Sequence, residues 1–63
     1  MGERFVSDRQ LADRYGVSRP SIWRWVMEKS FPAPVKLSPG CTRWPLTSIE
    51  QWEKKLLLES AHT

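Results

Sequence analysis

The chain has 63 residues, the size of one small domain and close to the lower limit for folding without disulfides or a metal. Of these residues 40% are hydrophobic, and four tryptophans make the apolar fraction bulky enough for a compact core. This length leaves no room for a deep substrate cleft. Because the sequence also lacks paired carboxylates, a nucleophile beside a base and a glycine-rich phosphate loop, we expect that the protein is not an enzyme.

Metal-binding and membrane proteins need residues that this sequence does not supply. Cys41 is the single cysteine, which excludes an internal disulfide, and the single histidine, His62, has no partner at zinc-ligand spacing. We therefore expect no metal and no cofactor. The sequence has no apolar run long enough for a transmembrane helix or a signal peptide, so we expect a cytoplasmic protein with a reduced thiol and no contact with membranes.

The net charge of +3 is distributed unevenly along the chain. Residues 1–13 and residues 44–63 each have a balance of −1, whereas residues 14–43 hold six basic residues against one acidic residue, a balance of +5. A basic excess confined to one segment is typical of a surface that binds a polyanion. From charge alone, a solvated face is an equally good interpretation.

The first predicted helix covers residues 8–15. Ser7 can accept hydrogen bonds from the amides of its first turn, and Gln10 stands three residues later, which is the spacing of a capping box. Gly16 follows the helix at the position where a left-handed residue commonly ends one.

A second helix is predicted from about residue 19 to about residue 30. Ser18 is placed to cap it, and a proline in its first turn costs no hydrogen bond. Ile22, Trp25 and Val26 recur at helical spacing and should form its buried stripe. Two prolines after residue 30 favour extended backbone and end the helix.

A β-hairpin is predicted over residues 35–45, where two short alternating segments flank a Pro-Gly turn. A hairpin of this size is not stable by itself and must pack on the helices. Trp44 is the expected anchor of the hairpin in the core, and Cys41 is expected to be a small filler in the second strand.

A third helix is predicted over about residues 48–59, and Thr47 and Glu50 stand at capping-box spacing at its start. Its predicted core-facing stripe consists of Ile49, Trp52, Leu56 and Leu57. Leu58 falls outside that stripe.

Two short helices joined by the link Gly16-Val17-Ser18 should cross at a steep angle, as in a helix-turn-helix. The expected fold is therefore mostly α with a small β-hairpin. We expect a winged helix-turn-helix, in which a two-stranded wing and a C-terminal helix follow the two crossed helices, as a single domain over residues 1–63. In this fold one face of the second helix packs on the core and the other enters the DNA major groove.

The predicted DNA contacts lie at the exposed start of the second helix and on the wing. Arginine can form paired hydrogen bonds with guanine, and serine hydroxyls or free helix amides can hold phosphate. The predicted contacts are Ser18, Arg19, Ser21, Trp23 and Arg24 on the helix, with Lys36 and Arg43 on the wing. For Trp23, packing against the hairpin or the third helix is an equally good interpretation.

Several short segments form a pattern through their order and spacing. They are Leu11-Ala12, Tyr15-Gly16-Val17-Ser18-Arg19, Ile22-Trp23-Arg24, Phe31-Pro32-Ala33-Pro34-Val35-Lys36-Leu37, Arg43-Trp44 and Ile49-Glu50-Gln51-Trp52. Over about residues 5–57 this pattern resembles the AlpA-type phage and prophage regulators, within the excisionase-like and MerR-like winged-helix proteins.

The resemblance implies a winged helix-turn-helix that binds direct or inverted repeats near an attachment site or a promoter. Proteins of this kind steer an integrase toward excision or regulate transcription of integrase genes. The resemblance assigns recognition contacts to Arg19, Ser21 and Arg24, and it assigns the wing to Arg43 with the turn formed by Ser38, Pro39, Gly40 and Thr42. Two positions depart from the family, because Pro20 replaces a small polar residue and Trp23 replaces a tyrosine.

Two functions follow from these observations. The first is sequence-specific binding of double-stranded DNA, in which several copies bind cooperatively to repeats or act with a partner such as an integrase, since one reading helix covers only a few base pairs. The second is a protein-interaction adaptor or inhibitor with the same fold and an apolar surface of Trp23, Met27 and Leu58. The first is favoured because the basic excess falls on the segment that would face DNA.

Overall fold

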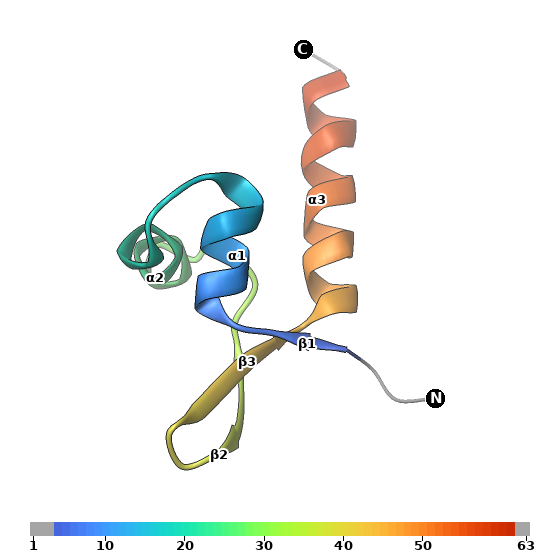
Figure 1. The fold of residues 1–63 in the computed structure, drawn as a ribbon. Coiled ribbons are helices and arrows are strands. Elements are labelled where there is room, and N and C mark those ends of the chain that lie inside the picture. Colours follow the sequence, from blue (N-terminus) through green and yellow to red (C-terminus); the bar gives the residue numbers. More distant parts are fainter. Residues whose placement is uncertain (1–3, 62–63) are drawn as a thin grey trace.

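The computed structural model describes residues 4–61 (Figure 1). In chain order its elements are β1 (Phe5–Val6), α1 (Asp8–Tyr15), α2 (Arg19–Met27), β2 (Val35–Ser38), β3 (Cys41–Pro45) and α3 (Leu46–Ala61). The predicted fold class is confirmed, since helices, hairpin and small antiparallel sheet have the arrangement of a winged helix-turn-helix. The predicted single domain also included residues 1–3 and 62–63, with His62, and these lie outside the described residues.

The bounds of α1 agree with the prediction because both of its ends are capped as expected. The Ser7 hydroxyl accepts a hydrogen bond from the backbone N–H of Gln10 at 3.1 Å, and the Ser7 backbone N–H donates to the Gln10 side chain at 2.8 Å. At the other end Gly16 has a φ of 67°, the left-handed conformation that releases the chain toward α2.

Helix α2 ends at Met27, three residues earlier than predicted. Lys29 has a φ of 60°, and its N–H donates to the Val26 carbonyl while the Ser30 N–H donates to the Trp25 carbonyl, at 3.0 Å each. This pair of hydrogen bonds is the Schellman motif, in which glycine usually takes the left-handed position. The lysine at that position conceals the end of the helix from sequence analysis.

The hairpin of β2 and β3 is confirmed, with Ser38 opposite Cys41 and Pro39-Gly40 at the tip. Strand β3 is the middle strand of a three-stranded sheet, because β1 pairs with its other edge, with Val6 opposite Trp44. Strand β1 is not predicted from the sequence, since two residues carry no periodicity.

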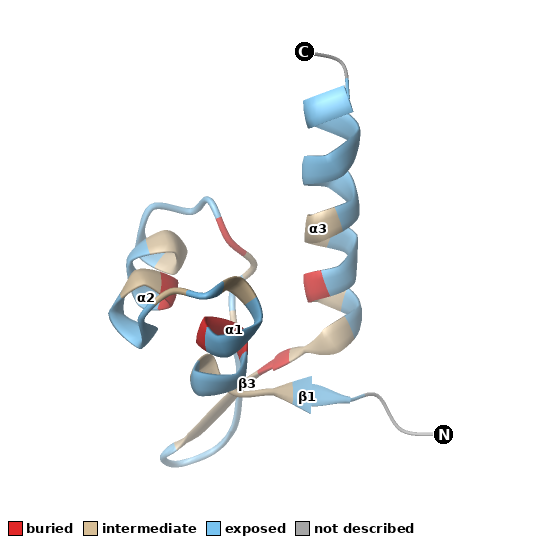
Figure 2. Ribbon diagram, turned by 45° about the horizontal axis from the view of Figure 1, so that its top comes forward, coloured by how far each residue is buried: buried red, intermediate tan, exposed pale blue. Residues whose placement is uncertain are grey.

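Helix α3 begins at Leu46, directly after β3, so Thr47 lies inside the helix and the predicted start is two residues late. Ile49 is buried, and Trp52 packs against the core. The prediction that Leu56 and Leu57 are buried is wrong, since they are 42% and 72% exposed. The last turns of α3 extend past the ends of α1 and α2, so no other element covers them (Figures 1 and 2).

The core is a small apolar cluster at the junction of the helices and the sheet (Figure 2). Its buried members are Leu11, Ala12, Ile22, Phe31, Trp44 and Ile49. The prediction that Trp44 anchors the hairpin is confirmed, because its ring is fully buried and its indole N–H donates to the Pro32 carbonyl at 2.8 Å.

Phe31, in the loop after α2, is the residue around which the aromatic side chains gather. Its ring centroid lies 6.3 Å from that of Tyr15 on α1 and 5.8 Å from that of Trp25 on α2. It also lies 6.2 Å from Trp44 on β3 and 4.7 Å from Trp52 on α3. One side chain therefore contacts all three helices and the sheet. Tilted and edge-to-face pairs of aromatic rings stabilise a fold by more than the apolar area that they bury.

Replacing this ring tests its central position. We expect Phe31→Ala to lower the free energy of unfolding by about 3–5 kcal/mol, because it leaves a cavity where four elements meet. Phe31→Leu should lower it by about 1 kcal/mol. Both are measured by guanidinium denaturation followed by circular dichroism. Leu58→Ala is the control, with an expected change within about 0.5 kcal/mol. Equal effects of Phe31→Ala and Leu58→Ala would contradict the central role of Phe31.

Candidate nucleic-acid interface

Helices α1 and α2 form the crossed pair that the sequence predicts. In Figure 1 α2 is seen nearly end-on while α1 runs up the page, so the two helices cross steeply. Leu11 and Ala12 of α1 and Ile22 of α2 are buried in the cluster between them. The opposite face of α2 is exposed, and its residues are Arg19, Pro20, Trp23, Arg24 and Met27.

The two predicted serine contacts lie together at the start of α2. Ser18 has the extended backbone of an N-cap, but its side chain does not cap the helix. Its hydroxyl lies 3.0 Å from the Ser21 hydroxyl, and the Ser21 N–H donates to the Ser18 carbonyl at 3.1 Å. Ser18 is therefore the N-cap residue that the sequence predicts, but its hydroxyl does not form the capping hydrogen bond, and both hydroxyls lie beside the free end of the helix.

Asp8 of α1 connects two of the predicted contacts on α2. Its carboxylate accepts a hydrogen bond from the Trp23 indole N–H at 2.9 Å and one from the Arg19 Nε at 3.3 Å. The hydrogen bond from Trp23 is the main cause that holds the pKa of Asp8 below its usual range, and Arg19 adds to it. The sequence analysis assigns no role to Asp8, because its two partners lie 11 and 15 residues away on another helix.

Trp23 is positioned by packing as well as by this hydrogen bond. Its ring centroid lies 5.1 Å from that of the buried Trp44 on β3. Of the two interpretations given for Trp23, packing and DNA contact, the structure therefore shows the packing against the hairpin. The ring is still 36% exposed, so a contact of its outer edge with DNA stays a prediction.

Arg24 differs from Arg19 in having no internal partner. Its side chain is exposed, and within residues 4–61 it forms no hydrogen bond and no ion pair. The guanidinium group therefore loses no interaction of the fold when it binds a ligand.

The two predicted cations of the wing point to opposite faces of the hairpin. Lys36 pairs with Thr42 across the strands, and Arg43 pairs with Val35. Because directly opposed residues share a face and successive residues alternate, Lys36 and Arg43 lie on different faces. Lys36 is exposed, whereas Arg43 is half-buried and donates from Nη1 to the Thr42 carbonyl at 2.8 Å.

The predicted wing turn is exposed and uncharged. Ser38, Pro39 and Gly40 are exposed, and Thr42 is half-buried on β3. Gly40 has a φ of 79°, and a Cβ built on it would meet no atom within 4 Å. Backbone conformation is thus what favours glycine at the tip.

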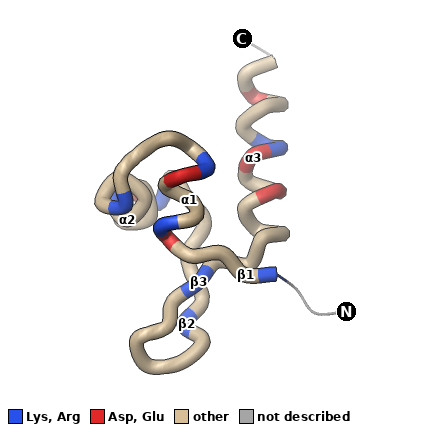
Figure 3. Tube along the Cα trace, in the orientation of Figure 1, with Lys and Arg blue, Asp and Glu red and all other residues tan. Residues whose placement is uncertain are grey.

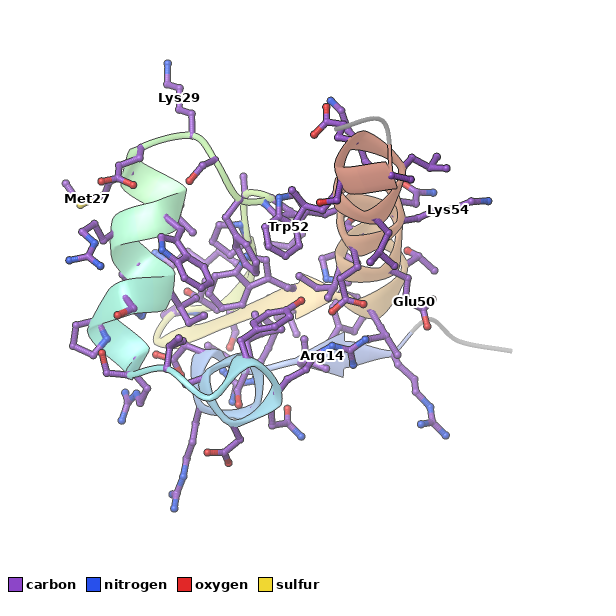
Figure 4. All side chains as sticks on the ribbon, turned by 90° about the horizontal axis from the view of Figure 1, so that it is seen from above. Arg14, Met27, Lys29, Glu50, Trp52 and Lys54 are labelled. Atoms are coloured by element: carbon purple, nitrogen blue, oxygen red, sulfur yellow. The ribbon has the colours of Figure 1, made fainter. Side chains whose placement is uncertain are left out.

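Basic residues occur on α2 and on both strands of the hairpin, whereas α3 mixes both signs (Figure 3). Arg14 belongs to the basic segment by sequence, but it forms a two-pronged ion pair with Glu53 of α3, with both N–O distances 2.7 Å (Figure 4). This arginine therefore joins α1 to α3. Within the basic segment of residues 14–43, the cations that remain for a ligand are those of α2, its C-terminal loop and the hairpin.

Tyr15 completes the connection between α1 and α3, since its hydroxyl donates to the same Glu53 carboxylate. The hydrogen bonds from Arg14 hold the pKa of Glu53 below its usual range. Burial, and then the bond to Glu53, raises the pKa of Tyr15 well above its usual range. Glu53 lies 39 positions from Arg14 and 38 positions from Tyr15 in sequence, so no local motif reveals the cluster.

Residues 4–61 contain no group of three His, Cys, Asp or Glu side chains that could hold a metal ion. None of the helices within that range is both long enough and apolar enough to cross a membrane.

A family model described as prophage CP4-57 regulatory protein (AlpA) matches residues 4–57. The chain belongs to the AlpA family. This membership confirms the resemblance seen in the sequence and identifies the protein as a prophage regulator. Searches of curated proteins and of solved structures found no significant match. The residues that match the AlpA family include α1, α2, the hairpin and all the predicted DNA contacts.

The Arg14–Glu53–Tyr15 cluster makes the stability of this AlpA-family protein depend on pH. Because the folded-state pKa of Glu53 lies below its ordinary value of 4.5, the ionised carboxylate stabilises the fold above that pH, and this contribution is lost as pH falls through the folded pKa. Glu53→Gln should therefore lower the free energy of unfolding at pH 7 by about 1 kcal/mol, and it should reduce the loss of stability on acidification.

Denaturation curves of the wild type and Glu53→Gln, recorded from pH 7 down to acidic pH, measure this contribution of Glu53 to stability. Glu50→Gln is the matched control, since Glu50 lies exposed on the same helix (Figure 4), and we expect it to change stability by less than about 0.5 kcal/mol. Parallel pH profiles for the wild type and Glu53→Gln would refute the role of this carboxylate.

Proposed function

We propose that this AlpA-family protein binds double-stranded DNA sequence-specifically, with α2 in the major groove and the β2–β3 wing beside it, and that it has no catalytic activity. The observation that carries the proposal is the outer face of α2. There Arg24 is exposed and has no side-chain partner among residues 4–61, next to a hairpin whose two charged residues are both basic. An arginine on such a face can form paired hydrogen bonds with guanine.

The state of Arg19 supports the same function. It uses one guanidinium nitrogen, Nε, to bind Asp8, and a guanidinium carries further N–H donors on its two terminal nitrogens. Asp8 thus orients Arg19 and leaves donors for a base or a phosphate. Ser18 and Ser21, at the free amides of α2, are placed to hold a phosphate beside it.

The geometry of the wing suits a groove with phosphates on two sides. Lys36 and Arg43 point to opposite faces of the hairpin, so a hairpin inserted edge-on would bring one cation to each wall. A minor groove offers such walls, and the uncharged tip around Pro39 and Gly40 could enter it. We propose that Ser38 and Thr42 contribute backbone or hydroxyl contacts there.

The proposed biological role is excision of a prophage or genomic island, regulation of transcription of an integrase gene, or both. Membership in a family of prophage regulators supports this role. Because one reading helix covers few base pairs, we propose that several copies bind cooperatively to repeats at an attachment site or promoter, in the cytoplasm and with an integrase as partner.

Arg24→Ala should weaken binding to an attachment-site duplex by about tenfold or more, because it removes a base contact without disturbing the fold. Lys54→Ala is the matched control, since it removes a cation that points away from the rest of the molecule on α3 (Figure 4). We expect its affinity to stay within about twofold of the wild type. Fluorescence anisotropy at several salt concentrations measures both, and wild-type affinity should fall steeply with salt.

Equal affinities of the two variants, or an affinity that does not respond to salt, would exclude this mode of binding.

The adaptor alternative predicts instead that the Arg24→Ala variant keeps its function. Its proposed surface is not continuous, because Met27 points away from α3 on the outer side of α2 (Figure 4), while Leu58 lies on α3 itself.

The finer role can be tested in a reconstituted excision reaction with the integrase of the same element. Wild-type protein should increase the excised product, and Arg24→Ala should not. If only the activity of an integrase promoter responds to the protein, the role is transcriptional and the excision proposal fails.

A further inference from the structure

The carboxylate of Asp8, at the start of α1, lies against the side of α2 that carries predicted DNA contacts. One oxygen, Oδ2, accepts a hydrogen bond from the Trp23 indole N–H at 2.9 Å and one from the Arg19 Nε at 3.3 Å. Arg19 and Trp23 are four residues apart, so they are neighbours on one side of α2. A negative charge at this place weakens the attraction of the surface for every polyanion alike. What it can improve is the choice between one DNA sequence and another.

The position of this carboxylate is fixed by its surroundings. The side chain of Asp8 is only 20% exposed. The hydrogen bond from Trp23, followed by smaller contributions that include Arg19, holds the pKa of Asp8 below its usual range, so the group is ionised at neutral pH. The indole ring of Trp23 in turn packs on the buried Trp44, with ring centroids 5.1 Å apart. The negative charge is therefore a fixed part of this surface.

The contact with Asp8 determines which donors of Arg19 face a ligand. The side chain of Arg19 is 62% exposed. A guanidinium has one edge of paired donors that includes Nε and another that consists of Nη1 and Nη2. Because Asp8 occupies Nε, the edge that stays complete is that of Nη1 and Nη2. Guanine presents O6 and N7 as paired acceptors in the major groove, and this edge matches them.

The surroundings of Arg19 favour a base over a phosphate. Asp8, Arg19, Pro20 and Trp23 line an open hollow of about 310 Å³. A phosphate that entered this hollow would meet the carboxylate as well as the guanidinium, so repulsion would offset much of the attraction. The edge of a base has no net charge and meets no such repulsion.

We propose that Asp8 is a positioning residue that determines sequence specificity, because it withholds Arg19 from the phosphate backbone and reserves its terminal donors for a guanine. This inference rests on the proposed DNA-binding function. It narrows the two ligands open to Arg19, a base or a phosphate, to the base. Without the charge of Asp8, Arg19 is free to bind the nearest phosphate of any sequence, and the protein discriminates less between sequences.

Asp8→Asn removes the charge and keeps an oxygen that can accept the hydrogen bond from the Trp23 indole. We expect its affinity for an attachment-site duplex to fall about fivefold, because Arg19 loses its orientation. Its affinity for a scrambled duplex of the same length and base composition should rise about twofold, because a negative charge is gone and Arg19 can bind a phosphate. Fluorescence anisotropy measures both affinities, and their ratio should fall about tenfold.

Asp13→Asn is the matched control, since Asp13 is exposed on the same helix, about 140° around it from Asp8. It removes the same charge without releasing an arginine. Any change in affinity should therefore be the same for both duplexes, and the ratio should stay within about twofold of the wild type. Equal ratios for Asp8→Asn and Asp13→Asn overturn the proposal.

Two measurements show whether Asp8 acts through Arg19. In an Arg19→Ala background, Asp8→Asn should no longer change the ratio of affinities, whereas an independent effect of Asp8 would persist undiminished. On the scrambled duplex, the logarithm of the affinity of Asp8→Asn should fall more steeply with the logarithm of the salt concentration, with a slope greater by about one, because one more phosphate contact forms. A persisting effect or an unchanged slope overturns the role of Arg19.

Hydrogen exchange followed by NMR tests the contact itself without DNA. Trp23→Phe identifies the indole N–H signal of Trp23 as the one that disappears. That signal should exchange slowly in the wild type and in Asp8→Asn, and faster in Asp8→Ala, which removes the acceptor. Equal exchange in the wild type and Asp8→Ala overturns the positioning of Trp23 by Asp8.

The anisotropy data also separate this inference from the function on which it rests. If the wild type binds the attachment-site and scrambled duplexes equally well, sequence-specific binding fails, and the role of Asp8 in specificity fails with it. If the wild type prefers the attachment-site duplex and Asp8→Asn keeps that preference, the proposed function stands and only the role of Asp8 is refuted.

Discussion

The ring of Phe31 lies where α1, α2, β3 and α3 meet, and the relative positions of these elements depend on it. A chain of 63 residues has little apolar area to bury, so a few large side chains must hold several elements at once. Phe31 packs on Trp44, and Trp44 packs on Trp23 at the surface of α2. Through these contacts the core sets the distance and angle between α2 and the β2–β3 hairpin.

Polar contacts add a second set of constraints at the margins of this core. Glu53 receives hydrogen bonds from Arg14 and Tyr15 and so connects α3 to α1, where apolar packing ends. On the other side of the sheet, the Leu46 N–H donates to the Arg4 carbonyl at 2.8 Å and connects the start of α3 to β1. Helix α3 is therefore held at its base and middle, while its last turns are exposed.

Local signals in the sequence predict those parts of the fold that depend on neighbouring residues. The caps at Ser7 and Gly16 define α1, and the Pro-Gly turn defines the hairpin. Contacts between distant residues have no such signal, which is why Asp8 and the role of Phe31 are not predicted. Periodicity indicates which side of α3 faces inward but not where the core ends, so Leu56 is wrongly predicted to be buried. The predicted DNA contacts fall on exposed or half-exposed positions, but the opposed faces of Lys36 and Arg43 follow only from the strand register.

The different environments of the two arginines on α2 have a consequence for how such a regulator diverges. Arg24 has no partner within the described residues, so a change there breaks no contact of the fold. Arg19 and Trp23 share the carboxylate of Asp8, so a change at either removes one of the two side-chain donors to that carboxylate on α1. In the proposed DNA complex, drift toward a new operator preference can therefore proceed by single substitutions at the position of Arg24. At the start of α2 the same drift requires a compensating substitution in α1, and those positions should covary among descendants.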